Sequence, residues 1–295
     1  MCAQFFKKSS LGPGPDLRVC WGLRRAILAW GVGGLLALVA CSRPSSPSPP
    51  SKTTPAHPQS QPSRPLRVAA AADLEPAFSA LAVSYRQRHG REVVFSFAGS
   101  MALAQQIEHG APFDLYAAAS QHHVETLRSK GRIVPGSLRL FARGALVLWT
   151  RPSSPDAADR GAPLPSQIGD LTQAQYRRIA LANPDHAPYG LAAVQALRSA
   201  GLYDTLKGRL VFGENIRQAH QFVATGNADV ALDALSLALA AGTPHTPVPQ
   251  ALYQPLLQAL GHVTGGDAGG ASAFVDLLLS DEGKRVLTRF GFAAP

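Results

Sequence analysis

From Leu66 onward, short apolar runs alternate with longer segments in which apolar residues recur every three or four positions. Residues 75–89 show the second pattern, because Phe78, Leu81 and Tyr85 fall on one face of a helix. Runs typical of strands cover residues 66–72, 92–98, 115–118, 145–150, 178–182, 210–212 and 230–232, and helical patterns cover 75–89, 101–109, 123–130, 190–200 and 216–225. This alternation predicts an α/β fold of βαβ units, with largely parallel sheets covered by helices on both faces.

The N-terminal region has the features of a lipoprotein signal peptide. Arg24 and Arg25 precede an apolar run, residues 26–40, which has the length of a signal-peptide core and is short for a membrane span. Residues 38–41 read Leu-Val-Ala-Cys and match the bacterial lipobox. We therefore expect residues 1–41 to be a signal peptide ending at a lipidated Cys41. An ordinary secretory signal that is cut elsewhere is the alternative.

Residues 42–65 consist mostly of Pro, Ser, Thr and Gln and show no apolar periodicity. Such a segment cannot bury enough surface to offset its ordering entropy, so we expect a disordered tether between the anchor and the body. The cysteines are Cys2, Cys20 and Cys41. Residues 42–295 therefore contain no disulfide, no cysteine nucleophile and no thiolate metal site.

The formal net charge of +9 is concentrated at the N-terminus. Residues 1–65 carry eight basic residues and one acidic residue, which leaves 20 basic and 18 acidic residues for the other 230. The body is thus nearly neutral and shows no basic stripe that could follow a phosphate backbone. Nucleic acid is therefore not an expected partner.

Candidate chemistry lies at strand-to-helix turns, where ligands bind in open α/β sheets. Four turns combine small residues, hydroxyl groups and free helix N–H groups: Ala72-Asp73, Gly99-Ser100, Tyr189-Gly190 and Asn215-Ile216. Asp73, Ser100 and Asn215 are candidate helix caps, and tight packing or simple capping explains each turn taken alone. Together the turns offer neutral donors without Arg or Lys, a set that can hold a dehydrated dianion.

Enzyme motifs are missing from the body of the chain. It contains no Gly-x-Ser-x-Gly nucleophile elbow, no metal-ligand spacing and no Gly-rich phosphate loop. We therefore expect a binding protein that has no catalytic residues, no cofactor and no direct ligands for a metal ion.

These same turns resemble the molybdate-binding component of bacterial molybdate importers. The resemblance runs through residues 67–74, 97–100, 103–115, 183–190, 213–218 and the C-terminal segment 274–292, and it covers essentially all of residues 66–295. It implies a type II periplasmic-binding-protein fold, with two doubly wound lobes and a ligand cleft between them. The first lobe would comprise residues 66–143 and 248–295, and the second would comprise residues 144–247.

The resemblance also implies a ligand shell. Ala72, Asp73 and Ser100 would bind the oxyanion from one lobe, and Tyr189 and the backbone N–H of Ile216 would bind it from the other. Two positions depart from the pattern of the family. Ala72 replaces a frequent serine and can bind only through its backbone. Asp233 is a poor neighbour for an anion, so it either points away from the cleft or indicates a different specificity.

The implied function is capture of molybdate or tungstate outside the cytoplasm, in the periplasm of the cell envelope, by a monomeric, membrane-anchored lipoprotein. Its partners would be the inner-membrane permease and the ATPase of an ABC importer. A receptor for another oxyanion, for iron or for a small organic anion is the nearest alternative. An envelope enzyme and a sensory lipoprotein on the same fold are more distant ones.

Overall fold

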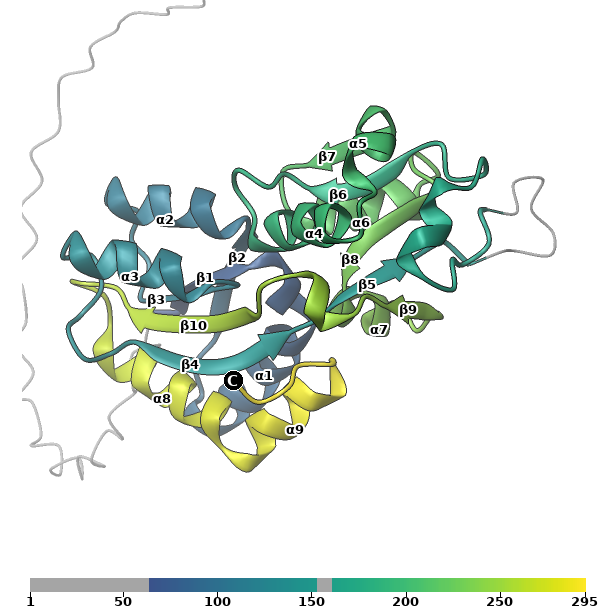
Figure 1. Cartoon of the computed structure of the whole chain (residues 1–295). Coiled ribbons are helices and arrows are strands. Elements are labelled where there is room, and N and C mark those ends of the chain that lie inside the picture. The colour runs from purple at the N-terminus through teal and green to yellow at the C-terminus, as the bar shows by residue number, and fades with distance from the viewer. Residues whose placement is uncertain (1–63, 153–160) are drawn as a thin grey trace, which may run out of the picture. The chain divides into compact units, whose positions relative to one another are not determined.

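The computed structural model of the protein describes residues 64–152 and 161–295. Within these ranges the chain forms two five-stranded sheets, each covered by helices. We call each sheet with its helices a lobe (Figure 1). The predicted signal peptide, Cys41 and the predicted tether up to residue 63 lie outside the described residues. Among the described residues, no helix combines the length and the apolar character that crossing a membrane requires.

The first lobe contains a sheet with the strand order β2-β1-β3-β10-β4. Its strands are β1 (Leu66–Ala71), β2 (Val93–Ala98), β3 (Leu115–Ala118), β4 (Arg139–Gly144) and β10 (Leu256–His262). One face is covered by α1 (Glu75–His89), α8 (Ala268–Leu279) and α9 (Asp281–Arg289), and the other by α2 (Ser100–Glu108) and α3 (Gln121–Ser129). Phe78 of α1 packs edge-on against Phe274 of α8 at 5.5 Å in the larger core.

The second lobe contains a sheet with the strand order β7-β6-β8-β5-β9. Its strands are β5 (Leu146–Trp149), β6 (Ile179–Ala182), β7 (Leu210–Gly213), β8 (Val230–Ala234) and β9 (His245–Pro247). Its helices are α4 (Pro188–Ser199), α5 (Tyr203–Leu206), α6 (Ile216–Ala224) and α7 (Leu235–Ala240). It also contains the short 3₁₀ turns η2 (Ile168–Thr172) and η3 (Lys207–Arg209), whereas η1 (Ala72–Leu74) follows β1 in the first lobe and η4 (Gln250–Leu252) lies between β9 and β10. The described chain passes between the lobes from β4 to β5 and again from β9 to β10.

The predicted α/β class and the two-lobed architecture are confirmed, and each sheet is largely parallel, with one strand that opposes the other four. Strand β10 runs antiparallel to β3 and β4, and β5 runs antiparallel to β8 and β9. Both β5 and β10 enter their sheet from the other lobe, at the edge where the parallel strands end. Each therefore runs antiparallel to the other strands of its sheet. Strands β4, β9 and β10 and helices α5, α7, α8 and α9 were not predicted, and the ends of the predicted elements differ from the observed ones by at most two residues.

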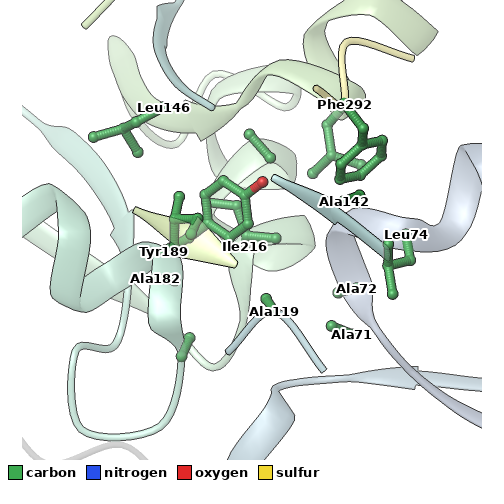
Figure 2. Packing of buried hydrophobic residues seen from close by; sticks show 14 of the residues in the cluster. Ala71, Ala72, Leu74, Ala119, Ala142, Leu146, Ala182, Tyr189, Ile216 and Phe292 are labelled. Carbon is green, nitrogen blue, oxygen red and sulfur yellow. The ribbon is translucent and has the colours of Figure 1, made fainter. Parts of the chain in front are cut away.

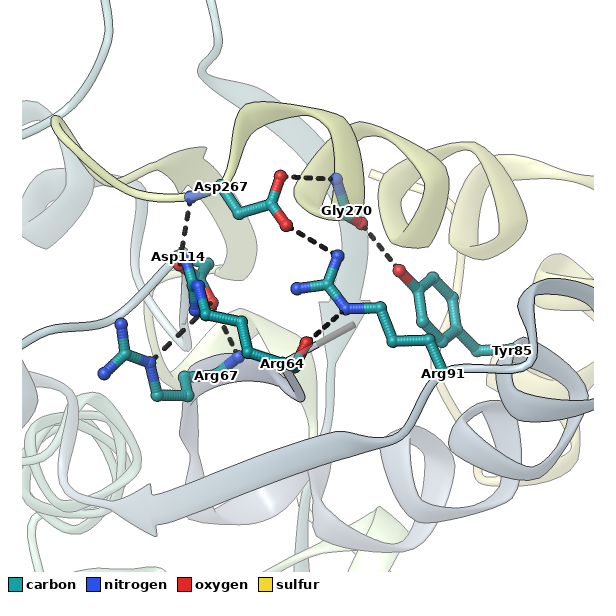
Figure 3. A network of polar contacts seen from close by, with 7 residues as sticks. All are labelled: Arg64, Arg67, Tyr85, Arg91, Asp114, Asp267 and Gly270. Carbon is teal, nitrogen blue, oxygen red and sulfur yellow. Dashed lines mark hydrogen bonds and ion pairs between the residues drawn. The ribbon is translucent and has the colours of Figure 1, made fainter. Parts of the chain in front are cut away.

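The start of the first lobe is fixed by the buried carboxylate of Asp114 (Figure 3). Arg64, a residue of the predicted tether, donates two hydrogen bonds to it, at 2.9 and 2.7 Å. The backbone N–H groups of Arg67 and Asp267 donate two more, at 2.8 and 3.0 Å. Asp114 thus joins the first strand to the loop before α8, so it organises the scaffold and does not line the cleft.

Candidate functional site

The four predicted turns meet at one small cavity between the lobes. The described residues that line it are Ala71, Ala72, Asp73, Ala98, Gly99, Ser100, Ala119, Ala187, Pro188, Tyr189, Asn215 and Ile216. They follow the carboxyl ends of β1, β2, β3, β6 and β7, and Figure 2 shows Tyr189 and Ile216 facing the turn that carries Ala71 and Ala72. All five predicted ligand residues, Ala72, Asp73, Ser100, Tyr189 and Ile216, are therefore brought together. The cavity measures about 10 Å³, as the space open to the centre of a water molecule.

Ser100 is the first residue of α2 and is almost fully buried. Gly99, and not Ser100, occupies the cap position, so the alternative in which Ser100 is a simple helix cap is wrong. Its Oγ instead accepts a hydrogen bond from the backbone N–H of Ala119 at 3.1 Å. A hydroxyl that accepts in this way keeps its own proton to donate. A side chain on Gly99 would meet the carbonyl oxygens of Glu214 and His186 of the other lobe at 3.3 and 3.4 Å, which explains glycine there.

Asp73 lies in the 3₁₀ turn η1 and is only 1% exposed. It does not cap the following helix as expected, because the cap residue of α1 is Leu74 and no side chain bonds there. Its Oδ2 instead accepts a hydrogen bond from Nε2 of Gln258 at 2.7 Å, and its Oδ1 has no partner among the described residues. Burial raises the pKa of this carboxyl to about 7, although the hydrogen bonds that it accepts oppose the rise.

Tyr189 enters the cavity from the first turn of α4 and is 2% exposed. Its hydroxyl reaches the neighbourhood of Asp73, whose pKa it lowers, yet in the described part of the chain it forms no hydrogen bond of normal geometry. Burial and the nearby carboxyl of Asp73 raise the pKa of the tyrosine, so the phenol keeps its proton at neutral pH. A buried donor without a partner is costly unless a ligand satisfies it.

The N-terminus of α6 forms the fourth side of the cavity. Asn215 caps this helix as predicted, since its Oδ1 accepts a hydrogen bond from the backbone N–H of Gln218 at 3.1 Å. The buried Ile216 is the first residue of the helix, where backbone N–H groups have no partner within the helix. The helix thus directs the positive end of its dipole toward the cavity.

Asp233 does not line the cavity. Its carboxylate lies 2.6 Å from Nδ1 of His220 and accepts a hydrogen bond from the backbone N–H of Ala234 at 2.8 Å. The imidazole of His220 in turn stacks on Trp149, with the ring centroids 4.0 Å apart. Of the two alternatives left open by the sequence, the structure favours an Asp233 that points away from the cleft.

Several contacts between the lobes surround the cavity. The hydroxyl of Ser236 in α7 donates to the carbonyl oxygen of Asp73 at 2.7 Å. The backbone N–H of Met101 donates to the carbonyl oxygen of His186 at 3.3 Å. At the rim, Arg217 pairs with Glu75 at 3.0 Å. The structure is therefore a closed form, in which the two lobes already meet around the site.

Gln258 and Ser236, which hold Asp73 in place, were not among the predicted site residues. Both come from elements that had not been predicted, β10 and α7, and both sit in apolar surroundings without a polar motif. Only the crossing of the chain between the lobes brings them to Asp73.

The electrostatics of the cavity are unusual for an anion site. None of the described residues that line it is Lys, Arg or His, and Asp73 is the one acidic residue among them. Nor do the described residues contain a cluster of His, Cys, Asp and Glu that could hold a metal ion. The cavity offers hydroxyl groups, backbone N–H groups and one carboxyl, a set suited to hydrogen bonding with oxygen atoms.

The comparison with known families decides the identity of the fold. A family model for bacterial extracellular solute-binding proteins matches residues 66–293. The chain belongs to this family. Among its relatives, the molybdate-binding protein ModA of Azotobacter vinelandii is 37% identical over 234 residues, which cover 77% of this chain and 89% of that protein. ModA of Rhodobacter capsulatus is 34% identical over 227 residues, which cover 76% of this chain and 86% of that protein.

A solved structure gives the same result. The periplasmic molybdate-binding protein of Azotobacter vinelandii aligns with a TM-score of 0.70 and 29% identity, over 78% of this chain and 99% of that one. The two-lobed arrangement of this solute-binding protein is thus the arrangement of its family, and the cavity lies where its lobes meet.

Proposed function

We propose that this protein captures molybdate or tungstate outside the cytoplasm and delivers it to an ABC importer. The observation that carries the proposal is the cavity between the lobes, which is small, buried and lined by neutral donors from both lobes. The relatives named as molybdate-binding proteins, of which the chain covers more than four fifths, support the choice of oxyanion.

The size and chemistry of the cavity argue against larger ligands. A space of about 10 Å³ excludes sugars, amino acids and peptides unless the lobes open. The hydroxyl of Ser100, the hydroxyl of Tyr189 and the N-terminus of α6 converge on it, and each has a proton that it can donate to an oxygen atom of a ligand. Oriented dipoles of this kind stabilise a dehydrated dianion without a fixed counter-charge.

Hinge closure is the proposed working motion. The described chain crosses between the lobes at two places, after β4 and before β10. An oxyanion that bonds to both lobes favours the closed form over the open one, because its bonds to the second lobe exist only after closure. The closed form would then be recognised by the permease and ATPase of the importer, with the protein acting as a receptor and not as an enzyme.

The anchor is a separate part of the proposal. The lipobox at residues 38–41 and the following Pro/Ser-rich segment support lipidation at Cys41 and a tether of about 20 residues. At roughly 3 Å per residue, such a tether lets the receptor reach an importer within several tens of ångströms of its anchor.

The test is a panel of ligands with the chain that lacks the predicted signal peptide, residues 42–295. Molybdate and tungstate should raise the melting temperature, whereas phosphate and ferric citrate should leave it unchanged. Calorimetry with molybdate should give one site per chain. A shift with ferric citrate or phosphate and none with molybdate would replace this proposal with the corresponding receptor. Sulfate shares charge and shape with molybdate, so its affinity relative to molybdate measures selection by size alone.

A further inference from the structure

The carboxyl of Asp73 is the feature of the cavity that the proposed function does not explain. It is 1% exposed, it lines the cavity, and its Oδ1 lacks a partner in the described part of the chain. Its other oxygen is held by Nε2 of Gln258 at 2.7 Å, so the group has a fixed orientation. A buried carboxylate that lines the cavity and a dianion bound in it would repel each other, with no cation among the described lining residues to offset the repulsion.

The groups packed around η1 supply little countercharge. Glu75 of α1 is already paired with Arg217 of α6 at 3.0 Å, and His220 of α6 is paired with Asp233 at 2.6 Å. Tyr189 of α4 lies beside Asp73, but its phenol is neutral because burial and the Asp73 carboxyl raise its pKa. The other ionisable residues of the helices and strands packed there lie farther along these elements: Tyr85, Arg86, Arg88, His89, Arg198 and His262. Helix α7 and strand β2 contain none.

The protonation of Asp73 resolves the conflict. We propose that Asp73 binds the oxyanion as a neutral carboxylic acid, so that one proton is captured with each oxyanion. This inference rests on the proposed function. The Oδ1–H group donates to an oxygen of the ligand, while Oδ2 keeps its hydrogen bond from Gln258. The side chain then belongs to the same set of donors as Ser100 and Tyr189, and the bound pair carries one negative charge less.

The pKa of the carboxyl gives this proposal its pH range. The ordinary value is 3.8, and burial in the closed form raises it to about 7 before any ligand is bound. A dianion beside the group raises it further, because like charge disfavours the ionised form. At pH 8 the free protein is therefore mostly ionised at Asp73 and the complex is mostly protonated. Binding at that pH takes up a proton, and the affinity falls as the pH rises.

The experiment is calorimetry of molybdate binding at pH 8 in two buffers that differ in their enthalpy of ionisation. The wild-type protein should take up about one proton per molybdate, and its affinity should fall about tenfold between pH 8 and pH 9. The Asp73→Asn variant keeps a neutral donor at the same place. It should take up no proton, and its affinity should not change with pH.

The Asp185→Asn variant is a matched control, because Asp185 is an exposed carboxylate in the loop before α4. It should behave as the wild type does. A proton count near zero for the wild type overturns the inference whether or not Asp73→Asn folds, and so does an equal count in wild type and Asp73→Asn. If the wild type binds molybdate without proton uptake, the proposed function stands and only this inference fails. If it does not bind molybdate at pH 6 to 9, both fail.

Discussion

The hydroxyl of Ser100 accepts a hydrogen bond from the backbone N–H of Ala119 at 3.1 Å, and this bond ties the ends of β2 and β3 together at the cavity. In the same turn, the phenol of Tyr116 donates to the carbonyl oxygen of Ser100 at 2.7 Å. The side chain and the backbone of Ser100 are thus both held by the strand β3 region. The hydroxyl proton is left to point at a ligand, since the oxygen is occupied as an acceptor.

Replacing Ser100 by alanine should weaken molybdate binding by roughly 10- to 150-fold, because one hydrogen bond to a charged ligand contributes about 1.5–3 kcal/mol. Calorimetry at pH 7 measures the change. The Ser129→Ala variant is the control, since that hydroxyl is exposed at the end of α3 and bonds only within its helix among the described residues. Unchanged affinity in Ser100→Ala would contradict the assigned cavity.

Gly144, the last residue of β4, should not accept a side chain. A Cβ at this position would collide with the hydroxyl of Tyr189 and lie 3.1 Å from Nε2 of Gln258. Gly144→Ala should therefore displace Tyr189, destabilise the closed form by about 1–3 kcal/mol and weaken molybdate binding at least about tenfold.

Thermal unfolding and calorimetry measure both effects of Gly144→Ala. In the control Gly208→Ala, a Cβ would meet no described atom within 4 Å, so stability and affinity should be preserved. If Gly144→Ala binds molybdate as tightly as the wild type, Tyr189 is not held where the structure places it.

The sequence predicted those parts of the site that depend on local chemistry. Ser100 and Ile216 follow strands directly, so their positions at helix N-termini were readable from the chain itself. The role of Asp73 could not be predicted from the chain, because Asp73 lies in a 3₁₀ turn and its carboxyl accepts a hydrogen bond from Gln258, which lies 185 residues away. The antiparallel strands were missed for the same reason, since their direction follows from the path of the chain between the lobes and not from any local pattern.

Asp114 should make the stability of the protein sensitive to acid. Burial raises the pKa of its carboxyl, but the hydrogen bonds from Arg64 and from the backbone N–H groups of Arg67 and Asp267 outweigh burial and hold the pKa below 3.8 (Figure 3). A depressed pKa contributes stability that is present above 3.8 and is lost as the pH falls through the lower value of the folded protein.

The Asp114→Asn variant tests this contribution. It should lower the free energy of unfolding at pH 7 by about 2–4 kcal/mol, because it leaves buried donors without a charged acceptor. The difference from wild type should shrink as the pH falls below 3.8. Urea unfolding at a series of pH values measures it, with the exposed Asp185→Asn as the control. A difference that does not vary with pH would contradict the linkage.

Lipidation at Cys41 is a prediction from the sequence alone. The lipobox at residues 38–41 provides the acceptor thiol, and no other cysteine lies beyond it. Cells that express the full chain should incorporate a palmitate analogue into the wild type and not into Cys41→Ser. Equal incorporation into both would show that the anchor is absent or lies elsewhere, while the binding activity of the body would be unaffected.

Competition with phosphate tests how the cavity treats a ligand that carries its own proton. If Asp73 is protonated in the complex, the site consists of donors, and the proton of hydrogen phosphate would be buried without an acceptor at a cost of about 1–3 kcal/mol. At pH 7, about a hundredfold excess of phosphate should therefore fail to displace molybdate, whereas tungstate should displace it near stoichiometry. The opposite arrangement, an ionised Asp73 that accepts the proton of phosphate, makes a different prediction. Phosphate would then displace molybdate from the wild type and lose that ability in Asp73→Asn, because the amide nitrogen facing the cavity can only donate. The wild type and Asp73→Asn, compared in one titration, thus separate a site for unprotonated oxyanions from a site for protonated ones.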